Sequence, residues 1–321
     1  MWSRWLQSDG LSDALIAASR ASIARGSKSF ALASRLFGPV LRDRATLLYA
    51  WCRYADDVID GQDAGFGRVE HAGTPAERLA VLEARTRAAL AGEISGNPAY
   101  DALARVAAET AMPDRYPLDL IEGFRIDVDD RRFVTFDDTL TYAYHVAGCV
   151  GVMMAIAMGV SSEDRATLDR ACDLGMAFQL NNIARDVIED AANGRCYLPE
   201  DWLAEAGLSR ATFAAPANRA ALAGVVARLV NTAERYEASS RFGTPALTRR
   251  AAWAVLAAAD IYGGIGRRVR AGSAAALDRR VTTSRIEKLL AVARTLPLAL
   301  TRARRWPAPG LSRAGLWTMP L

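Results

Sequence analysis

Cysteine, lysine and histidine are all scarce in this chain. Its 321 residues include four cysteines and two histidines, and of its 40 basic residues only Lys28 and Lys288 are lysines. The cysteines, at positions 52, 149, 172 and 196, show neither metal-ligand nor disulfide spacing. This argues against a zinc domain or a disulfide framework and favours the reducing cytoplasm as the compartment. The excess of arginine over lysine most simply reflects a compositional bias.

We expect neither a secretory signal nor a membrane-spanning helix. Residues 1–10 contain no continuous apolar core, so they do not form a signal sequence. Residues 142–162 contain no Asp, Glu, Lys or Arg and come close to the length of a membrane span. Their three glycines and His145, together with few Leu and Ile residues, favour a buried helix in a helical bundle instead.

No strong excess of either charge is present. The formal net charge is +4, and acidic and basic residues are interspersed, so we expect no nucleic-acid partner. A small net positive charge is also compatible with an anionic substrate or with a membrane surface. Residues 302–307 combine arginines with Trp and Pro, and we expect residues 296–321 to form a flexible or membrane-touching tail.

Strand-like alternation of Val and Ile is rare, and Gly or Pro separates segments of helical length. With 51% hydrophobic residues and abundant Ala and Leu, this pattern predicts an all-α protein. No segment between residues 20 and 295 has the composition of a linker, and no repeat of fixed period is visible. We therefore expect one helical domain over residues 1–321, with its core in residues 20–295.

Two acidic clusters, at residues 56–60 and 186–190, each follow an apolar, helix-compatible stretch. Because each residue of a helix turns by about 100°, acids four positions apart project from one face and can reach a common ion. Carboxylates are hard ligands suited to Mg²⁺ or Mn²⁺, which usually bridge protein carboxylates to substrate phosphates. The clusters therefore predict one divalent-metal site with a phosphate ester as its partner.

Solvated helix faces carry the same spacing, so either cluster alone is ambiguous. The stretch before the first cluster, residues 47–55, holds one Arg in nine residues, which is less charge than a surface helix shows. Before and within the second cluster, Gln179, Asn182 and Asp186 advance by three and four positions among large apolar residues. This polar stripe is typical of a helix that lines a cavity.

Five segments together resemble the squalene/phytoene synthase family. They are Ser27–Phe30, Tyr49–Asp60, Tyr144–Gly151, Gln179–Asp190 and Gly194–Pro199. The resemblance extends from about residue 20 to 295. It implies an all-helical isoprenoid-synthase fold, a bundle around a central hydrophobic cavity, with the aspartate motifs on opposing helices at its mouth.

The resemblance also implies a metal site and diphosphate-binding groups. The implied Mg²⁺ or Mn²⁺ ligands are Asp56, Asp60, Asn182, Asp186 and Asp190, whereas Asp57 and Glu189 adjoin them without being assigned. Charge that builds on a departing diphosphate must be neutralised, and guanidinium groups bind phosphate oxygens bidentately. We therefore expect Arg53 and Arg185 to act with Asp56 and Asp186 in catalysis, although each arginine could instead only pair with its neighbouring acid.

Further residues are implied to contact the substrate. A carbocation needs a dry pocket with electron-rich walls, and Tyr144 is expected near the reacting carbons. The remaining implied substrate-binding residues are Ser27, Lys28, Ser29, Phe30, Gln179, Tyr262 and Arg280. Any one aromatic residue among these could equally be plain core, and His145 is assigned no catalytic role.

The family divides by donor and product. Local resemblance favours the branch that couples two geranylgeranyl diphosphates through a cyclopropylcarbinyl diphosphate to phytoene, which ends in proton loss and needs no NADPH. Squalene, hydroxysqualene and dehydrosqualene synthesis from farnesyl diphosphate are the alternatives. A single-substrate terpene cyclase and a non-catalytic assembly factor are further rivals. The implied partners are the prenyl diphosphate, a peripheral membrane contact at the inner face and a downstream desaturase.

Overall fold

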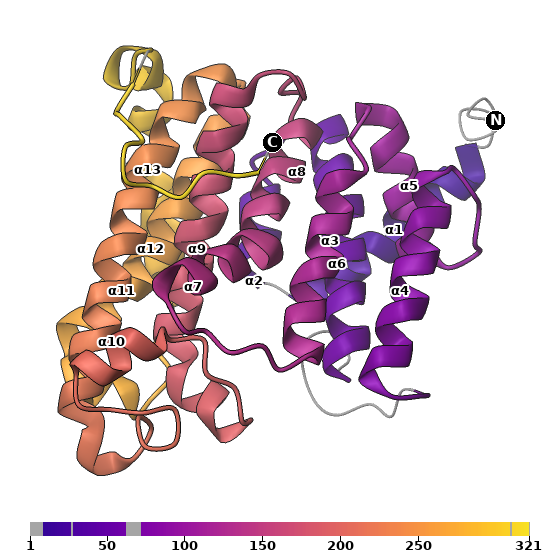
Figure 1. The fold of residues 1–321 in the computed structure, drawn as a ribbon. Helices are drawn as coiled ribbons and strands as arrows, with labels where there is room; N and C mark the ends of the chain where they lie inside the picture. Colours follow the sequence, from indigo (N-terminus) through magenta and orange to yellow (C-terminus); the bar gives the residue numbers. More distant parts are fainter. Residues whose placement is uncertain (1–8, 27, 62–71, 309, 321) are drawn as a thin grey trace.

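The computed structural model describes residues 9–26, 28–61, 72–308 and 310–320, and within these the side chains of residues 9–13, 22, 24–26 and 28–30 are outside the description. All elements in the described ranges are helical (Figure 1). The predicted all-α class is therefore confirmed. The α-helices are α1 Asp9–Gly26, α2 Lys28–Ser34, α3 Pro39–Asp60, α4 Pro75–Leu90, α5 Pro98–Thr110, α6 Arg115–Val128, α7 Phe136–Ala143, α8 Cys149–Ala157, α9 Arg165–Ala192, α10 Glu200–Glu205, α11 Arg219–Ser240, α12 Arg249–Leu277 and α13 Arg285–Arg305. Three short elements complete the set: the π-helix η2 Tyr144–Gly148 and the 3₁₀-helices η3 Pro216–Asn218 and η4 Arg241–Ala246.

Helix α3 places the first acidic cluster at its carboxyl end. Pro39 opens the helix, where its missing N–H costs no hydrogen bond. Gly61 ends it directly after Asp60 by adopting a left-handed conformation with φ 66°, which glycine reaches without steric cost. Trp51 and Ala55 of the same helix are fully buried, so one face anchors the helix while another carries the acids.

Helix α9 runs through the middle of the molecule and packs against α8, α11 and α12 (Figure 1). Its contact with the preceding helical segment is unusually close at Gly175. A Cβ atom there would lie 2.1 Å from the backbone oxygen of Ala147. A Cβ at Gly151 would likewise lie 2.4 Å from the backbone oxygen of Ala171. These glycines allow the backbones to touch and hold the second acidic motif at a fixed distance from η2 and α8.

The charge-free segment that resembled a membrane span lies largely inside the bundle. It overlaps the helical segment Phe136–Ala157, which is long and apolar enough to cross a membrane, but 61% of an 18-residue apolar window within that segment is buried. Val152 and Met153 have no exposed surface. The expected buried helix is present, but it is not continuous, because the π turn Tyr144–Gly148 separates α7 from α8. A π turn accommodates one extra residue within a helix, and the sequence pattern gives no sign of it.

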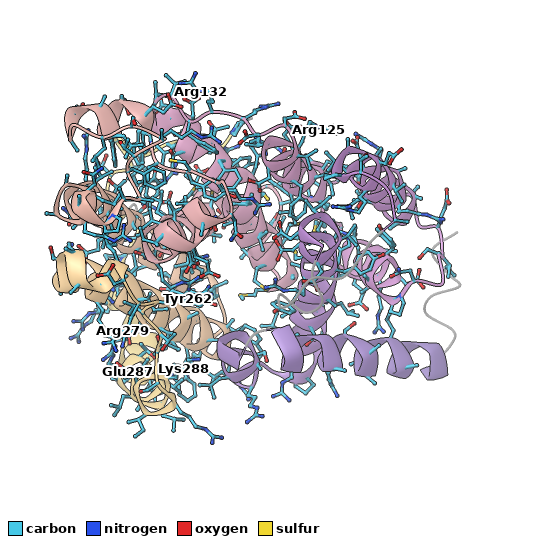
Figure 2. The ribbon with its side chains drawn as sticks, turned by 90° about the horizontal axis from the view of Figure 1, so that it is seen from below. Arg125, Arg132, Tyr262, Arg279, Glu287 and Lys288 are labelled. Atoms are coloured by element: carbon cyan, nitrogen blue, oxygen red, sulfur yellow. The ribbon has the colours of Figure 1, made fainter. Side chains whose placement is uncertain are left out.

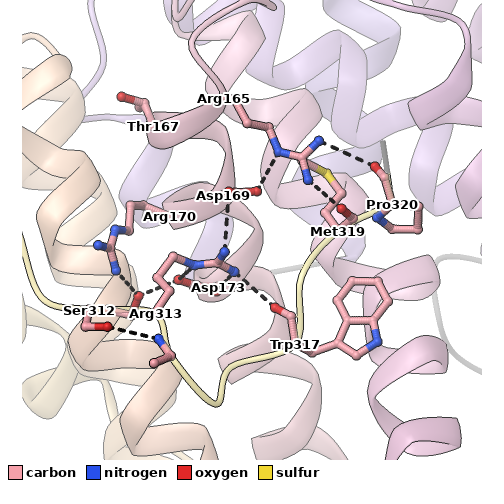
Figure 3. A network of polar contacts seen from close by, with 12 residues as sticks. Arg165, Thr167, Asp169, Arg170, Asp173, Ser312, Arg313, Trp317, Met319 and Pro320 are labelled. Carbon is pink, nitrogen blue, oxygen red and sulfur yellow. Dashed lines mark hydrogen bonds and ion pairs between the residues drawn. The ribbon is translucent and has the colours of Figure 1, made fainter.

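The chain after α13 returns across α9 to the neighbourhood of α8 (Figure 1). Arg313 makes the central contacts of this returning segment (Figure 3). The Nε and Nη2 atoms of Arg313 donate to the carboxylate of Asp173 at 3.0 and 2.9 Å, and its Nη1 lies 3.3 Å from the carboxylate of Asp169. Asp173 has no exposed surface and also accepts a hydrogen bond from Ser239. Burial raises the pKa of Asp173 although Arg313 and Ser239 lower it.

The last described residues are similarly docked. The backbone oxygen of Met319 accepts a hydrogen bond from Arg165, and its side chain is 1% exposed (Figure 3). The backbone N–H of Trp317 donates a hydrogen bond to the Tyr236 hydroxyl at 3.0 Å. We name residues 310–320 the C-terminal strap. The expectation of a flexible or membrane-touching tail did not anticipate these contacts.

Candidate active site

A largely apolar cavity of about 520 Å³ lies between α3, η2, α8, α9, η4 and α12. Its lining changes along its length. Small and apolar side chains form the middle, Arg53, Gln179, Asn182 and Arg185 gather at one end, and Thr167 and Arg170 belong to the other. The wall includes Leu48, Tyr49, Cys52, Val146, Ala147, Val150, Gly151, Met154, Leu174, Gly175, Phe178, Ala254, Val255, Ala258, Ile261 and Tyr262. The arrangement suits a long apolar molecule with a polar head.

The first acidic motif stands beside this polar end. Arg53 lines the cavity and its Nη1 lies 2.5 Å from the carboxylate of Asp56 and 4.0 Å from that of Asp57. Asp60, one turn further along α3, pairs with Arg195 at 2.9 Å. The predicted acid pair therefore lies on one side of the helix end, with arginines held against it.

The second motif is arranged in the same way on α9. Arg185 grips the carboxylate of Asp186 through two of its nitrogens, Nε at 2.8 Å and Nη2. Arg280, from the segment between α12 and α13, approaches from the other side, with Nε 3.1 Å from Asp186 and Nη1 3.2 Å from Glu189. Arg53, Arg185 and Arg280 are therefore each paired with a motif acid, and their role in binding diphosphate stays a prediction.

The two motifs meet across the cavity mouth through residues that the sequence analysis did not assign. Arg195, in the turn after α9, reaches Asp60 of α3. Asp127, near the end of α6, accepts hydrogen bonds from the hydroxyls of Tyr142 at 2.9 Å and Tyr197 at 2.8 Å. The rings of these two tyrosines stack with centroids 4.7 Å apart, so the Asp127 carboxylate is firmly positioned.

The pKa values of Asp56 and Asp190 at this mouth are raised. Burial, together with the charges of Asp60, Asp57 and Asp127, raises the pKa of Asp56 to about 7 although Arg53 lowers it. Burial and the charges of Asp186, Glu189 and Asp127 likewise raise the pKa of Asp190 to about 7 although Arg195 lowers it. The charge of Asp127 contributes to the raised pKa of both Asp56 and Asp190, so acids of three helices influence one another here.

This acidic space fits a divalent cation that is shared with a substrate. Among the described residues, no three His, Cys, Asp or Glu side chains converge closely enough to hold one metal ion by themselves. Within the same part of the chain, the Asp190 carboxylate has no hydrogen-bond or ion-pair partner, and its pKa is raised to about 7. Asn182 donates to Gln179 at 3.4 Å, which leaves its own oxygen free to accept. Such a donor set suits Mg²⁺ or Mn²⁺ with phosphate oxygens and water completing the coordination.

Tyr144 is buried next to the cavity rather than in its wall. Its side chain has no exposed surface and is not part of the cavity wall. Its hydroxyl donates to the carboxylate of Asp119 on α6, and its ring centroid lies 5.0 Å from that of Trp317 in the C-terminal strap. The π turn directs Val146 and Ala147 to the cavity instead. Tyr144 therefore lies behind the cavity wall, and its expected role near the reacting carbons stays a prediction.

The other predicted substrate contacts fall into two groups. Gln179 and Tyr262 line the cavity, and the ring of Tyr262 stacks on Phe178 with centroids 4.5 Å apart. Arg279 is labelled in Figure 2 beside Glu287 and Lys288 at the start of α13. Ser27 lies outside the described residues, as do the side chains of Lys28, Ser29 and Phe30.

Asp127 and Arg195 are the functional candidates that sequence reasoning missed. Arg195 stands in a segment already noted for its family resemblance, but no role was given to it. Asp127 is an acid among the buried residues Phe124 and Ile126 of α6, and an acid in such a context was the available signal. Tyr49 and Phe178 are further aromatic residues of the wall that the analysis left unassigned.

Comparison with known proteins gives one family. The sequence profile of the squalene/phytoene synthase family matches residues 23–287. Among curated relatives, the 15-cis-phytoene synthase of Paracoccus sp. is 49% identical, over 95% of this chain and 98% of the relative. The 15-cis-phytoene synthase of Pantoea ananas is 47% identical, over 94% of this chain and 96% of the relative.

Solved structures agree with the fold. A crystal structure of a dehydrosqualene synthase with a bound ligand superposes with a TM-score of 0.79. It is 26% identical to this chain and covers 92% of it, and 98% of that structure is matched.

Proposed function

Because this chain belongs to the squalene/phytoene synthase family, we propose that it acts as a phytoene synthase. It joins two geranylgeranyl diphosphates head to head, through a cyclopropylcarbinyl diphosphate, and releases diphosphate on the way to phytoene. Four curated relatives at 47–49% identity, each matched over nearly its whole length, are phytoene synthases. The structural observation that carries the proposal is the pair of acid-bearing helix ends at the polar end of one apolar cavity.

The arginines at the cavity end are proposed to receive the departing diphosphate. Arg53 and Arg185 both line the cavity, and Arg280 faces them from beyond Asp186. A guanidinium group offers two parallel N–H donors to phosphate oxygens and remains charged throughout. Since the three groups are already held in position by the acids, they stabilise developing negative charge with little reorganisation.

Mg²⁺ or Mn²⁺ is the proposed cofactor, held by Asp56, Asp60, Asn182, Asp186 and Asp190. When bound, the ion supplies Lewis-acid neutralisation of the leaving diphosphate. The carboxylates themselves orient the arginines, and Asp127 adds negative charge that favours cation binding between the two motifs. Residues 27–29 are proposed, from family resemblance, to contact a second diphosphate.

The walls of the cavity are proposed to protect the carbocation. Apolar side chains from α8, α9 and α12 exclude water along most of its length, which prevents quenching. The stacked pair Phe178 and Tyr262 presents aromatic surface close to the polar end, where a cation would arise. Cys52, also in the wall, stays a neutral thiol because burial raises its pKa to about 12.

The product determines the expected partners. The reaction ends in proton loss and therefore needs no NADPH. Its product is a long hydrocarbon, which is insoluble in water and cannot simply diffuse away from the enzyme. We therefore propose a cytoplasmic protein with a peripheral membrane contact, which passes its product to the bilayer or to a consuming enzyme such as a desaturase.

The test is incubation of the purified protein with geranylgeranyl or farnesyl diphosphate. Each reaction contains Mg²⁺ or Mn²⁺ and is run with and without NADPH before product analysis. A C40 hydrocarbon formed from two donors without NADPH is the expected result. A C30 product from farnesyl diphosphate would move the assignment to a squalene-type or dehydrosqualene-type synthase. A cyclised product from one donor, or no turnover at all, would contradict the proposal.

A further inference from the structure

Helix α13 exposes an unusual amount of apolar surface. Of the ten large hydrophobic side chains that are exposed in the described part of the chain, five lie on this one helix. Their exposed fractions range from 39% for Leu296 to 70% for Ile286. These five residues are Ile286, Leu289, Leu290, Leu296 and Leu300. A concentration of this kind on one element is characteristic of an interaction surface.

The exposed residues form one continuous face. At about 100° per residue, they and the exposed Ala293 and Pro297 all fall on the same half of the helix. The opposite half of the helix packs against the rest of the protein. Ala291, Thr295 and Ala299 on this half are buried, and the indole N–H of Trp253 on α12 donates a hydrogen bond to the backbone oxygen of Val292 at 2.8 Å. The helix is therefore fixed on α12, and its apolar face points outward from Ile286 to Leu300, a length of about 21 Å.

Basic side chains surround this face. Arg285 at the beginning of α13 and Arg304 and Arg305 at its end have no hydrogen-bond or ion-pair partner in the described ranges. Arg279, just before the helix, is likewise exposed without a partner there, and Figure 2 draws it together with Glu287 and Lys288 near the start of α13. Glu287 is the one acid of this helix, and it is neutralised by Arg268 at 2.5 Å. The rim of the face is thus positively charged.

We infer that the outward face of α13 binds a lipid bilayer that contains anionic headgroups. An apolar helical face of this width enters the interface between headgroups and acyl chains, and flanking arginines bind anionic phosphates. We name this surface, which consists of Ile286, Leu289, Leu290, Ala293, Leu296, Pro297 and Leu300 with the flanking arginines 285, 304 and 305, the α13 membrane face.

A second copy of the chain fits this surface less well. An isologous pairing would bring the unpartnered arginines of both copies together with no acid free to neutralise them. The contact also differs from the tail expected from the sequence. Trp306 is 8% exposed and packs in a cluster with Leu256 and Ala299, so it does not reach lipid.

The position of the α13 membrane face suggests a use for membrane binding, and this part of the inference rests on the proposed function. Helix α12 carries α13 on one side and lines the cavity with Ala254, Val255, Ala258, Ile261 and Tyr262 on the other. Docking through α13 therefore holds the apolar cavity one helix away from the bilayer. A water-insoluble product would use this proximity, whereas binding itself requires no turnover.

The experiment measures co-sedimentation with vesicles of phosphatidylcholine alone and of phosphatidylcholine with phosphatidylglycerol. The test variant is Leu290→Glu with Leu300→Glu. The matched control is Val81→Glu with Ile94→Glu, which changes two equally exposed apolar residues elsewhere and adds the same charge. We expect wild type and control to bind the anionic vesicles, and the test variant to partition about tenfold less or weaker still.

A second variant, Arg304→Gln with Arg305→Gln, should weaken binding to anionic vesicles by about fivefold per arginine at low salt. Equal binding by test variant and wild type would overturn the inference. Equal weakening in the control would also overturn it, because the effect would then come from added charge alone. Conversion of a wild-type dimer to monomer with vesicle binding unchanged would assign the face to self-association instead.

Phytoene formation in detergent micelles separates this inference from the proposed function. We expect the test variant to turn over donor in detergent like wild type, because none of its changed residues lines the cavity. Normal vesicle binding with no turnover would contradict the proposed function and leave the membrane face standing.

Discussion

The guanidinium of Arg195 lies 2.9 Å from the carboxylate of Asp60, although 135 positions separate the two residues. This ion pair joins the turn after α9 to the end of α3. It therefore bridges the two acidic motifs at the cavity mouth and holds their helix ends at a fixed separation. Arg195 also lowers the pKa values of Asp127 and Asp190, so one cation influences acids on three elements.

Neutralising either motif should slow the reaction strongly. Asp56→Asn or Asp186→Asn removes a carboxylate that positions an arginine and is proposed to bind metal. The expected cost is several kcal/mol of barrier, or roughly a hundredfold to thousandfold in kcat. The measurement is steady-state release of diphosphate from geranylgeranyl diphosphate. Asp43→Asn is the matched control on the same helix, since Asp43 pairs with Arg20 at 2.7 Å. Near-normal kcat in both motif variants would refute these assignments.

The contribution of Asp190 to the stability of the metal-free protein should fall as pH rises through the acidic range. The ordinary pKa of Asp190 is 3.8, and its folded value is about 7. Between these values the folded state holds a proton that the unfolded state has lost, so this stabilisation is complete below about pH 4 and gone above about pH 7. Thermal unfolding in chelator should therefore show a smaller decline in Tm over this window for Asp190→Asn than for wild type. An identical slope in the two proteins would contradict the raised pKa.

Removing Arg195 should shift the acid limb of the activity profile to higher pH. Arg195 lowers the pKa of Asp190, so Arg195→Gln leaves this carboxyl protonated at a pH where wild type is ionised. Since metal ligands must be deprotonated, half-maximal diphosphate release should require a higher pH. Arg210→Gln is the control, because Arg210 pairs with Asp130 at 2.6 Å and not with either motif. A shift of equal size in both variants, or in neither, would contradict this role.

The C-terminal strap should stabilise the fold through Arg313. Arg313→Ala leaves the fully buried Asp173 without its bidentate partner. We expect a loss of about 3 kcal/mol in the free energy of unfolding, measured with urea. Arg304→Ala, which removes an exposed arginine without a partner in the described ranges, should change stability by no more than about 0.5 kcal/mol. Similar losses in the two variants would show that the ion pair contributes little.

Filling the far end of the cavity should change the preferred donor. A Cβ atom at Gly243 would lie 2.8 Å from the Cβ of Arg170, and both residues line the cavity. Gly243→Val should therefore shorten the space for a prenyl chain and lower kcat/KM for geranylgeranyl relative to farnesyl diphosphate. Gly224→Val, at a site with no atom near the added Cβ, should leave the ratio unchanged. An unaltered ratio in Gly243→Val would place the chain end elsewhere.

The acidic motifs and the helical class were predictable because both depend on local spacing. Asp56 and Asp60, or Asp186 and Asp190, share a helix face by the geometry of the helix alone. Their common location was also implied by the family resemblance, and the ion pair of Arg195 with Asp60 and the shared influence of Asp127 agree with it. Which of these side chains bind a metal stays a prediction.

What the sequence did not reveal depends on tertiary contacts. Asp127 joins the site only because α6 ends beside both motifs, and its apolar neighbours Phe124 and Ile126 indicate burial without indicating the partner. The strap is similar: Arg313 and Asp173 are 140 positions apart, and neither residue signals its partner. Burial of Trp306 likewise follows from the packing of α13 on α12, whereas composition alone suggested an exposed tail.

The π turn Tyr144–Gly148 has a consequence for engineering the protein. One surplus position within a helical segment offsets everything that follows by about 100°. Excising a single amino acid there would straighten the backbone and rotate α8 about its own axis. Val150 and Met154 would then leave the cavity wall. The extra residue therefore determines which face of α8 lines the cavity, and no side-chain substitution can reproduce that effect.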